Sequence, residues 1–273
     1  MMVKRISLCI TAVISVMFAQ WTLAAPVAEY WAMWDASNES NAKQVDHSTW
    51  DNLLGSYTVI EPESGIVYVR YGDFDTAAQK NLRNYIEGLA KIDPRGYSKL
   101  EQKAYWMNLY NALSVQAVLE NFDTLKAAGF SERLDTRVLD KDRVKVAKEK
   151  LSLNDIEHRI LRPIWKDHRV LFGLNCATHD CPNLSARAYT ADNIKELLAA
   201  AGKRFINENS GVVYTDGVLY ASRLFQDYLA DFATDERMLR KVFAHYSQDM
   251  KALYMLGYKG DITYVTDSRL NMP

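Results

Sequence analysis

Two cysteines and a histidine share one short polar turn of this chain. Cys176 and Cys181 are the cysteines, and His179 lies between them. The preceding run, residues 169–175, is apolar, rich in β-forming side chains and ends at an asparagine. Reactive groups are commonly displayed where a rigid element ends and a loop leaves its side chains accessible. If the protein performs chemistry, we expect it at the end of this predicted strand.

The two cysteines admit three interpretations. A Cys176–Cys181 disulfide would be favoured in an exported protein, and the spacing permits it if the turn folds back. A zinc site would use Cys176, His179 and Cys181 with a fourth ligand, but a single C-x4-C cluster fits zinc patterns loosely. A thiolate nucleophile would need a nearby base to lower a thiol pKa that starts near ~8.5. We lean to Cys176 as the nucleophile because it ends the strand, whereas Cys181 precedes Pro182, which can begin a helical turn.

His158 is the base that we favour for such a thiol. It lies in a predicted helix whose apolar stripe, at 153, 156, 160 and 161, also contains Glu157. A carboxylate in that stripe must be salt-bridged, hydrogen-bonded or raised in pKa by desolvation. Adjacent helical residues point in different directions, so we expect no direct contact between Glu157 and His158. Histidine titrates where catalysis needs it, although a structural role fits the pattern equally well.

Two asparagines lie on the otherwise apolar face of the longest predicted helix. Asn108 and Asn111 share a stripe with Ala104, Val115 and a leucine. An unpaired buried amide costs ~1–3 kcal/mol, so both side chains must have partners. Asn108 or Asn111 would orient a catalytic group or a bound carbonyl; the alternative, which we favour, is that they tie loops to the core.

The first 24 residues differ from the rest of the chain. A basic start is followed by an almost uninterrupted apolar run, 6–18, and Thr22-Leu-Ala24 supplies small residues at the −3 and −1 positions of a cleavage site. This pattern is typical of a secretory signal peptide, and the run is short for a membrane span. We expect residues 1–24 to be removed and residues 25–273 to form one globular domain that is secreted or periplasmic. An uncleaved anchor is the alternative.

The charge balance argues against several kinds of partner. The chain has 33 basic and 34 acidic residues, and Lys4 and Arg5 lie in the predicted signal peptide, so the mature chain has 31 basic groups and a formal net charge of −3. A near-neutral chain without a basic block argues against nucleic acid. No other segment is long and apolar enough to span a bilayer. We expect no cofactor and no integral membrane segment, and a partner or substrate that is an unidentified protein or envelope component.

Local signals predict a helix-rich α+β fold with a small sheet. Capping residues and helical periodicity predict helices at 76–93, 98–121, 152–163, 190–207, 222–232 and 235–246. β-forming runs and turn residues predict strands at 57–60, 66–71, 169–175 and 262–265, and an Asp-Gly hairpin over 212–220. Residues 133–150 are expected to be a loop with a short hairpin. The segment 25–52 is expected to wrap the domain and bury its tryptophans, Trp31, Trp34 and Trp50.

Four motifs in a fixed order carry a resemblance to a known family. They are Tyr105–Leu113, Asp155–Pro163, Arg169–Leu184 around the cysteines, and a fourth within Leu219–Phe232. In this order they resemble the domain-of-unknown-function 547 family, from about Asp46 to the last third of the chain.

The resemblance implies export, since bacterial relatives are commonly exported, and a papain- or transglutaminase-like fold and chemistry, of which the family has been suspected. The Glu, His and Cys set of that chemistry would fall on Glu157, His158 and either Cys176 or Cys181. One departure is that many relatives have a histidine where this chain has Leu171. If that histidine is the family's base, this chain is an inactive or altered member.

The leading functional hypothesis is an exported thiol-dependent hydrolase or acyl-transferase acting on a peptide or amide bond. Cys176 would attack a carbonyl, His158 would take and return its proton, and Glu157 or Asn108 would orient the site. Backbone N–H groups of the turn would stabilise the oxyanion. One alternative is a non-catalytic periplasmic binding or scaffold domain with a Cys176–Cys181 disulfide and surface aromatics, including the tryptophan-rich N-terminus, that contact a partner. The other is a zinc-binding domain.

Overall fold

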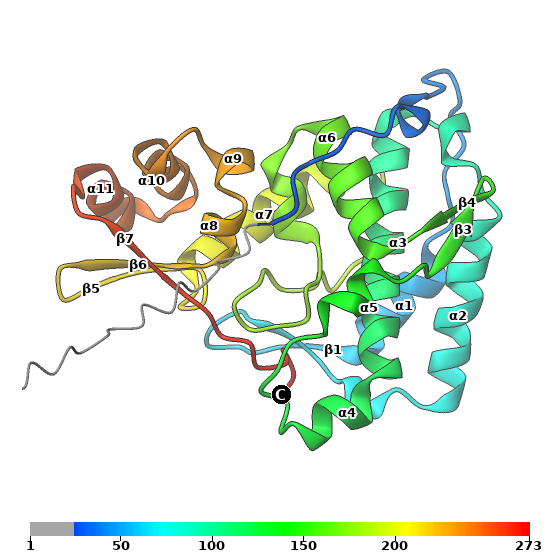
Figure 1. The fold of residues 1–273 in the computed structure, drawn as a ribbon, viewed down its shortest axis with the longest axis horizontal. Coiled ribbons are helices and arrows are strands. Elements are labelled where there is room, and N and C mark those ends of the chain that lie inside the picture. The colour runs from blue at the N-terminus through cyan, green and yellow to red at the C-terminus, as the bar shows by residue number, and fades with distance from the viewer. Residues whose placement is uncertain (1–24) are drawn as a thin grey trace, which may run out of the picture.

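The computed structural model describes residues 25–273, so the predicted signal peptide lies outside the described residues. Figure 1 shows a helix-rich α+β fold with small sheets, which confirms the predicted fold class. The helices are α1 Ser48–Tyr57, α2 Thr76–Ala90, α3 Lys99–Glu120, α4 Phe122–Ala127, α5 Thr136–Asp140, α6 Arg162–Trp165, α7 Ile194–Asn207, α8 Leu224–Asp227, α9 Leu229–Phe232, α10 Glu236–Tyr246 and α11 Asp249–Gly257. The strands are β1 Thr58–Ile60, β2 Val67–Val69, β3 Val144–Val146, β4 Glu149–Leu151, β5 Val212–Thr215, β6 Val218–Ser222 and β7 Ile262–Val265.

Helix α3 lies at the centre of the larger hydrophobic core. Ser98 caps it as predicted, because its Oγ accepts a hydrogen bond from the Glu101 backbone N–H at 3.3 Å. The Glu101 carboxylate accepts the backbone N–H of Val45 at 2.6 Å instead of completing the capping box. Every residue from 101 to 115 is buried, so the helix is enclosed by other elements all around its circumference.

The N-terminal segment wraps this core largely as predicted. Trp34 and Trp50 are buried, whereas Trp31 is only partly buried. Trp34 and Trp50 therefore stabilise the domain and are not part of the aromatic docking surface that the scaffold hypothesis expected.

Residues 169–175 do not form the predicted strand. His168–Gly173 is a 3₁₀ helix that lies between two hydrophobic cores. Val170 packs into the core around α3, and Leu171 and Phe172 pack into the second core. The apolar run therefore reflects burial on several sides and not pairing in a sheet, and an apolar run alone does not distinguish these cases.

Two glycines allow the close packing at this junction. A Cβ atom on Gly173 would lie 2.5 Å from Met107 Cε and 2.6 Å from Leu198 Cδ2. A Cβ atom on Gly202 of α7 would lie 2.7 Å from the Phe172 ring. A side chain at either position would require the neighbouring side chains to shift, so the two glycines permit the close approach of α3, the 3₁₀ helix and α7.

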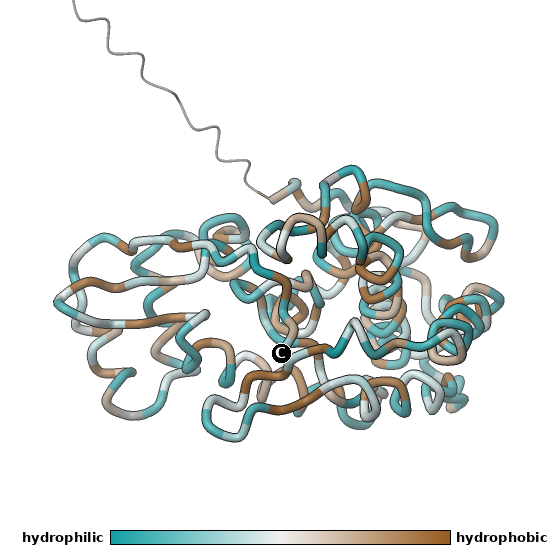
Figure 2. The backbone as a smooth tube through the Cα atoms, turned by 90° about the horizontal axis from the view of Figure 1, so that it is seen from below, coloured by the Kyte–Doolittle hydropathy of each residue, from teal (hydrophilic) through white to brown (hydrophobic). Residues whose placement is uncertain are grey.

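The second core lies beneath the three-stranded sheet β5–β6–β7. Strands β5 and β6 form an antiparallel hairpin whose turn residues, Asp216 and Gly217, have φ values of 51° and 78°. The predicted Asp-Gly hairpin is thus confirmed. Strand β7 pairs in parallel with β6, and α10 and α11 lie beside this sheet (Figure 1). Hydrophobic and hydrophilic residues alternate along these elements (Figure 2), as expected where each buries one side.

Several helix boundaries differ from the prediction. The helix expected over 152–163 is a π-helical segment, Asp155–Leu161, that continues into α6, and Pro163 lies in the first turn of α6, where proline is tolerated. The chain leaves α6 at Lys166, which adopts a left-handed conformation with φ 47°. The helix expected over 222–232 is divided at Tyr228 into α8 and α9. Within residues 25–273 no helix has the length and apolar character needed to cross a bilayer.

Candidate functional site

A cavity of about 430 Å³ opens beside the cysteine turn. It is bounded by α3, the π-helical segment, the cysteine turn, the start of α8 and the N-terminal residues. Its volume is that of a small-ligand site. Four residues selected from the sequence line it together: Glu157, His158, Cys176 and Cys181. Asn108 is not among the lining residues.

Glu157 is held by two tyrosines on opposite sides. The Tyr110 hydroxyl donates to Oε2 at 2.9 Å, and the Tyr228 hydroxyl donates to Oε1 at 2.6 Å. Burial raises the pKa of each tyrosine well above the usual value for tyrosine, and the neighbouring Glu157 carboxylate raises each pKa further. Both hydroxyls therefore stay protonated and orient the carboxylate.

His158 is held by Arg162, one turn further along the chain. Nη1 of Arg162 lies 2.8 Å from Nδ1 of His158. A guanidinium can only donate, so Nδ1 accepts and the neutral ring carries its proton on Nε2. Burial, aided by the Arg162 charge, lowers the pKa of His158 despite the neighbouring Glu157. At neutral pH the imidazole is therefore uncharged and offers the cavity an N–H donor.

The π-helical segment brings Glu157 and His158 closer than expected for adjacent helical residues. Nδ1 of His158 lies 3.8 Å from Oε1 of Glu157. Arg162 is fixed in turn by Asp231 of α9, whose carboxylate accepts two hydrogen bonds at 3.1 and 2.6 Å. π-Helical turns are rare and are found frequently at functional sites. The sequence contains no local signal for this geometry.

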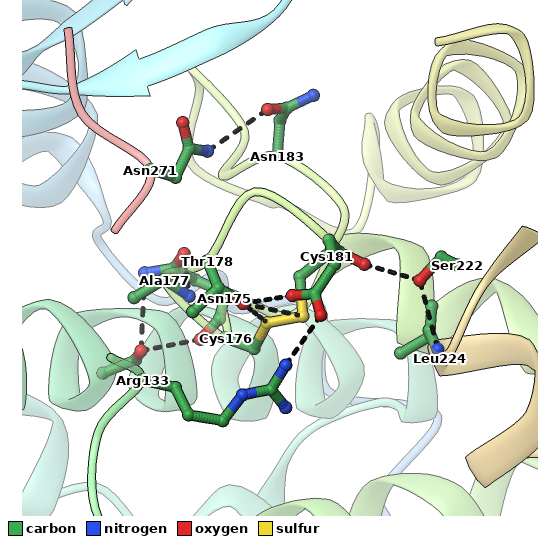
Figure 3. Close-up of a disulfide and its surroundings, with 12 residues drawn as sticks. Arg133, Asn175, Cys176, Ala177, Thr178, Cys181, Asn183, Ser222, Leu224 and Asn271 are labelled. Atoms are coloured by element: carbon green, nitrogen blue, oxygen red, sulfur yellow. Dashed lines mark hydrogen bonds and ion pairs between the residues drawn. A yellow bond between two sulfur atoms is a disulfide. The ribbon is translucent and has the colours of Figure 1, made fainter. Parts of the chain in front are cut away.

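Cys176 and Cys181 are joined by a disulfide, which Figure 3 shows at the cysteine turn. Their Cα atoms are 6.1 Å apart, within the usual range. Cys176 is partly exposed, whereas Cys181 is buried. The Thr178 hydroxyl lies 3.2 Å from the Cys176 sulfur and 2.6 Å from a carboxylate oxygen of Asp180, to which it donates.

The cysteine turn is anchored from two sides. Arg133 donates to the Asp180 carboxylate at 2.7 Å, and in Figure 3 its side chain extends toward the disulfide. Ser222, at the end of β6, donates to the Asp180 carbonyl oxygen at 2.6 Å. The buried Asp180 therefore connects the disulfide to both neighbouring segments.

The side chains of the two asparagines of α3 form hydrogen bonds with backbone groups. Asn108 donates to the Tyr189 carbonyl at 2.7 Å and accepts from the Tyr189 N–H at 3.0 Å. Asn111 donates to the Gly173 carbonyl and accepts from the Asn175 N–H, both at 2.9 Å. Each amide thus binds one loop in two places. Asn111 thereby supplies the hydrogen bonds that a neighbouring strand would give to the backbone of residues 173–175, just before Cys176.

The structure separates His179 from the two sulfur atoms. Its ring lies against Tyr68, with ring centroids 5.7 Å apart, and it does not line the cavity. Among residues 25–273 the potential metal ligands that cluster are Cys176, Asp180 and Cys181, with ligand atoms within 4.8 Å of one another. Sulfur atoms joined in a disulfide are not thiolate ligands, so the zinc set Cys176, His179 and Cys181 is not assembled.

Residues 94–206 match the family model described as "Protein of unknown function, DUF547". These residues, fewer than half of the chain, are similar to the DUF547 family. The matched residues include α3, the π-helical segment and the disulfide turn, which confirms the resemblance over this range, whereas residues 46–93 and the motif within Leu219–Phe232 lie outside the match. Comparison with curated proteins gives no match. Comparison with solved structures also gives none, and a papain- or transglutaminase-like architecture is not confirmed.

Segments outside the matched DUF547 residues complete the cavity. Arg223, Asp227 and Tyr228 contribute from the α8 region, and Ala25 and Pro26 contribute from the start of the described chain. Sequence reasoning did not select any of these residues. Tyr110 and Arg162 lie in the motifs that identified the family, so they could have been selected. Nothing local to Tyr228 or Ala25 indicates that they reach the same cavity.

The ionisable groups around the cavity are predominantly acidic. Among the described residues that line it, two carry guanidinium groups, Arg133 and Arg223. Four carry carboxylates: Asp140, Glu157, Asp180 and Asp227. Arg223 donates to Asp227 at 3.3 Å, yet burial raises the pKa of Asp227 above its usual value. No lysine is among the lining residues that the structure describes.

Proposed function

We propose that the protein is an exported thiol-dependent hydrolase or acyl-transferase whose reactive thiol is released by reduction of the Cys176–Cys181 disulfide. The observation that carries the proposal is that Glu157, His158 and both cysteines line one cavity. An arrangement of nucleophile, imidazole and oriented carboxylate is typical of thiol acyl transfer. The disulfide itself is consistent with an oxidising compartment.

Reduction is the first step of the proposed chemistry. A protein or small-molecule dithiol exchanges with the disulfide, leaving Cys176 and Cys181 as thiols and the reductant as a disulfide. We assign the nucleophile to Cys176 because it is the more exposed of the two. The Thr178 hydroxyl donates to Asp180, so its oxygen is available to accept the hydrogen of the Cys176 thiol and position the sulfur.

Acyl transfer then follows through a thioester. The Cys176 thiol gives its proton to solvent, the thiolate adds to the carbonyl carbon of an ester or amide, and the resulting oxyanion receives the hydrogen bond from Nε2–H of His158. Collapse expels the alcohol or amine, which takes a proton from solvent, and leaves the acyl group on sulfur. Water, or a second nucleophile in a transferase, cleaves the thioester and restores the thiol. His158 is thus a donor to the oxyanion in this scheme, because Arg162 occupies Nδ1.

The second candidate is a non-catalytic exported binding domain with a permanent disulfide. The observation that favours it is the bonded state of the two sulfur atoms, together with the enclosed Tyr110–Glu157–Tyr228 network beside them. In that case the cavity binds a small ligand and the disulfide only shapes its wall. The two candidates differ in the expected effect of reducing the disulfide, because only the first predicts that reduction produces activity.

The test is hydrolysis of p-nitrophenyl acetate and of an acyl thioester by the mature protein, with and without dithiothreitol. The proposal predicts turnover only after reduction, its loss in Cys176→Ser and its retention in Cys181→Ser. Cys181→Ser is the matched control because it also removes the disulfide but keeps the nucleophile. Absence of turnover by reduced wild-type protein, or equal turnover by both variants, would support the non-catalytic candidate.

A further inference from the structure

The first described residues lie against the candidate cavity. Residues 25–31 pass along the π-helical segment and α6 toward α8, and they form the blue segment beside α6 in Figure 1. Ala25 and Pro26 line the cavity itself. The backbone N–H of Ala25 donates to the carbonyl oxygen of Asp227 in α8 at 3.3 Å.

This N-terminal strap, residues 25–31, is fixed by contacts along its length. The backbone N–H of Glu29 donates to the His158 carbonyl at 2.9 Å, and that of Trp31 donates to the Arg159 carbonyl at 3.1 Å. The Arg159 guanidinium lies over the Trp31 ring at 4.1 Å.

Arg162 connects the N-terminal strap to the site. Its Nη1 donates to the Pro26 carbonyl at 2.6 Å, and the same atom contacts Nδ1 of His158 at 2.8 Å. Asp231 holds the rest of this guanidinium. The position of Ala25 is therefore determined by the same buried cation that orients His158.

From these contacts we infer that cleavage after Ala24 makes the α-ammonium group of Ala25 a cationic binding group of the cavity, which takes ligands that carry a carboxylate. The inference rests on the proposed export and on the predicted cleavage position, and not on the proposed thiol chemistry. A signal-peptidase-class enzyme and water would hydrolyse the Ala24–Ala25 bond. The hydroxyl of water goes to the Ala24 carbonyl carbon and its hydrogen to the Ala25 nitrogen, which takes a further proton from solvent.

Cleavage changes how many N–H donors the Ala25 nitrogen offers to the cavity. Before cleavage the Ala25 nitrogen is a neutral amide with one N–H, which Asp227 already accepts. After cleavage it is an ammonium with three N–H groups, since an α-amino group is largely protonated at neutral pH. Two donors and a full positive charge then become available in a cavity whose described lining has two guanidinium groups, Arg133 and Arg223, each already paired with a carboxylate. With the Nε2–H of His158 these groups match the oxygens of a carboxylate.

The experiment compares mature protein that begins at Ala25 with the same chain carrying a Gly-Ser extension before Ala25, both in the disulfide form. The extension restores the neutral amide at Ala25 and its bond to Asp227 and moves the ammonium group two residues away, so it is a control for an ammonium group at this position. The probes are N-acetylglycine and its uncharged analogue N-acetylglycinamide, with binding followed by NMR titration. We expect N-acetylglycine to bind the mature protein about tenfold more tightly than the extended one, and the amide to bind both equally.

A second readout is chemical and uses the same samples. Limited acylation of the Ala25 amine should be several-fold slower in the folded protein than in urea, and N-acetylglycine should slow it further. Equal acylation rates in both states, equal affinity of mature and extended protein for N-acetylglycine, or N-terminal sequencing of the exported protein that shows another first residue would overturn the inference. None of these outcomes depends on Cys176 chemistry, so they are separable from failure of the proposed function.

Discussion

Nη1 of Arg162 lies 2.8 Å from Nδ1 of His158, and this contact decides which nitrogen of the imidazole carries the proton. Because a guanidinium has no acceptor, the neutral ring must be the Nε2–H tautomer. His158 was selected from the sequence as a general base. The Nε2–H tautomer instead makes it a hydrogen-bond donor, which is the role that the proposed scheme gives it.

The tautomer can be observed directly. In protein labelled with ¹⁵N-histidine at pH 7, we expect His158 to show a nonprotonated Nδ1 and a protonated Nε2. Replacing Arg162 with glutamine, whose amide oxygen can accept, should allow the Nδ1–H tautomer to appear. A protonated Nδ1 in the wild-type protein would contradict the donor role.

Loss of the donor should reduce catalysis more than binding. If reduced protein turns over esters, His158→Ala should lower kcat by about 10²–10³-fold, the usual effect of removing one oxyanion donor. His158→Gln should recover part of this loss, because its amide supplies an N–H. A His158→Ala variant that remains folded and has wild-type kcat would exclude the role.

Asn108 should prove structural and not catalytic. Asn108→Ala leaves the N–H and carbonyl of buried Tyr189 without their partners, and we expect it to lower the free energy of unfolding by about 2–4 kcal/mol. Per folded molecule, kcat should not change, since Asn108 does not line the cavity. Urea unfolding and active-site titration measure the two effects separately. A large fall in kcat at unchanged stability would assign Asn108 to the chemistry.

The sequence predicts those elements whose signals are local. Ser98 and Asp235 cap α3 and α10 through their own side chains, and Asp216-Gly217 closes its hairpin through its own backbone angles. Each of these signals lies within a few residues of the structure that it determines. Their positions therefore agreed closely with the structure.

The prediction of a strand before Cys176 is wrong because the conformation of residues 169–175 depends on residues that are distant in the sequence. Asn111, more than sixty positions earlier, takes the hydrogen bonds that a neighbouring strand would take, and Gly173 and Gly202 permit the close packing. The same limit applies to the site. The family motifs contain Glu157 and His158, but only the folded chain brings Ala25 and Tyr228 to the same cavity.

The buried His47 should make stability depend on pH. Burial lowers its pKa from 6.5 to about 4, so the folded state resists protonation that the unfolded state accepts. Its contribution to stability is complete above pH 6.5 and is lost as the pH falls from 6.5 toward 4.

His47→Gln tests this dependence, because glutamine can still accept the Tyr85 hydroxyl and does not titrate. Between pH 7 and pH 5 the wild type should lose about 1–2 kcal/mol more free energy of unfolding than the variant. Urea unfolding at both pH values provides the comparison. Equal losses in the two proteins would show that another group carries the pH dependence.

Reduction of the disulfide should destabilise the domain only moderately. The bridge closes a loop with a sequence separation of 5, for which chain entropy predicts a loss of about 2 kcal/mol. The protein should therefore remain folded in dithiothreitol at 25 °C, as the proposed function requires. Urea unfolding with and without reductant measures the difference. Global unfolding on reduction would rule out a folded dithiol enzyme.

The most direct test of the account is the fate of an acyl group offered to the reduced protein. After brief exposure to p-nitrophenyl acetate, intact mass and peptide mapping should show one acetyl group on Cys176, formed faster than in the urea-unfolded chain and lost again on standing. Cys181 should acquire none. An acetyl group that forms on Cys176 no faster than in the unfolded chain, or that appears equally on both cysteines, would contradict the claim that this cavity activates a thiol.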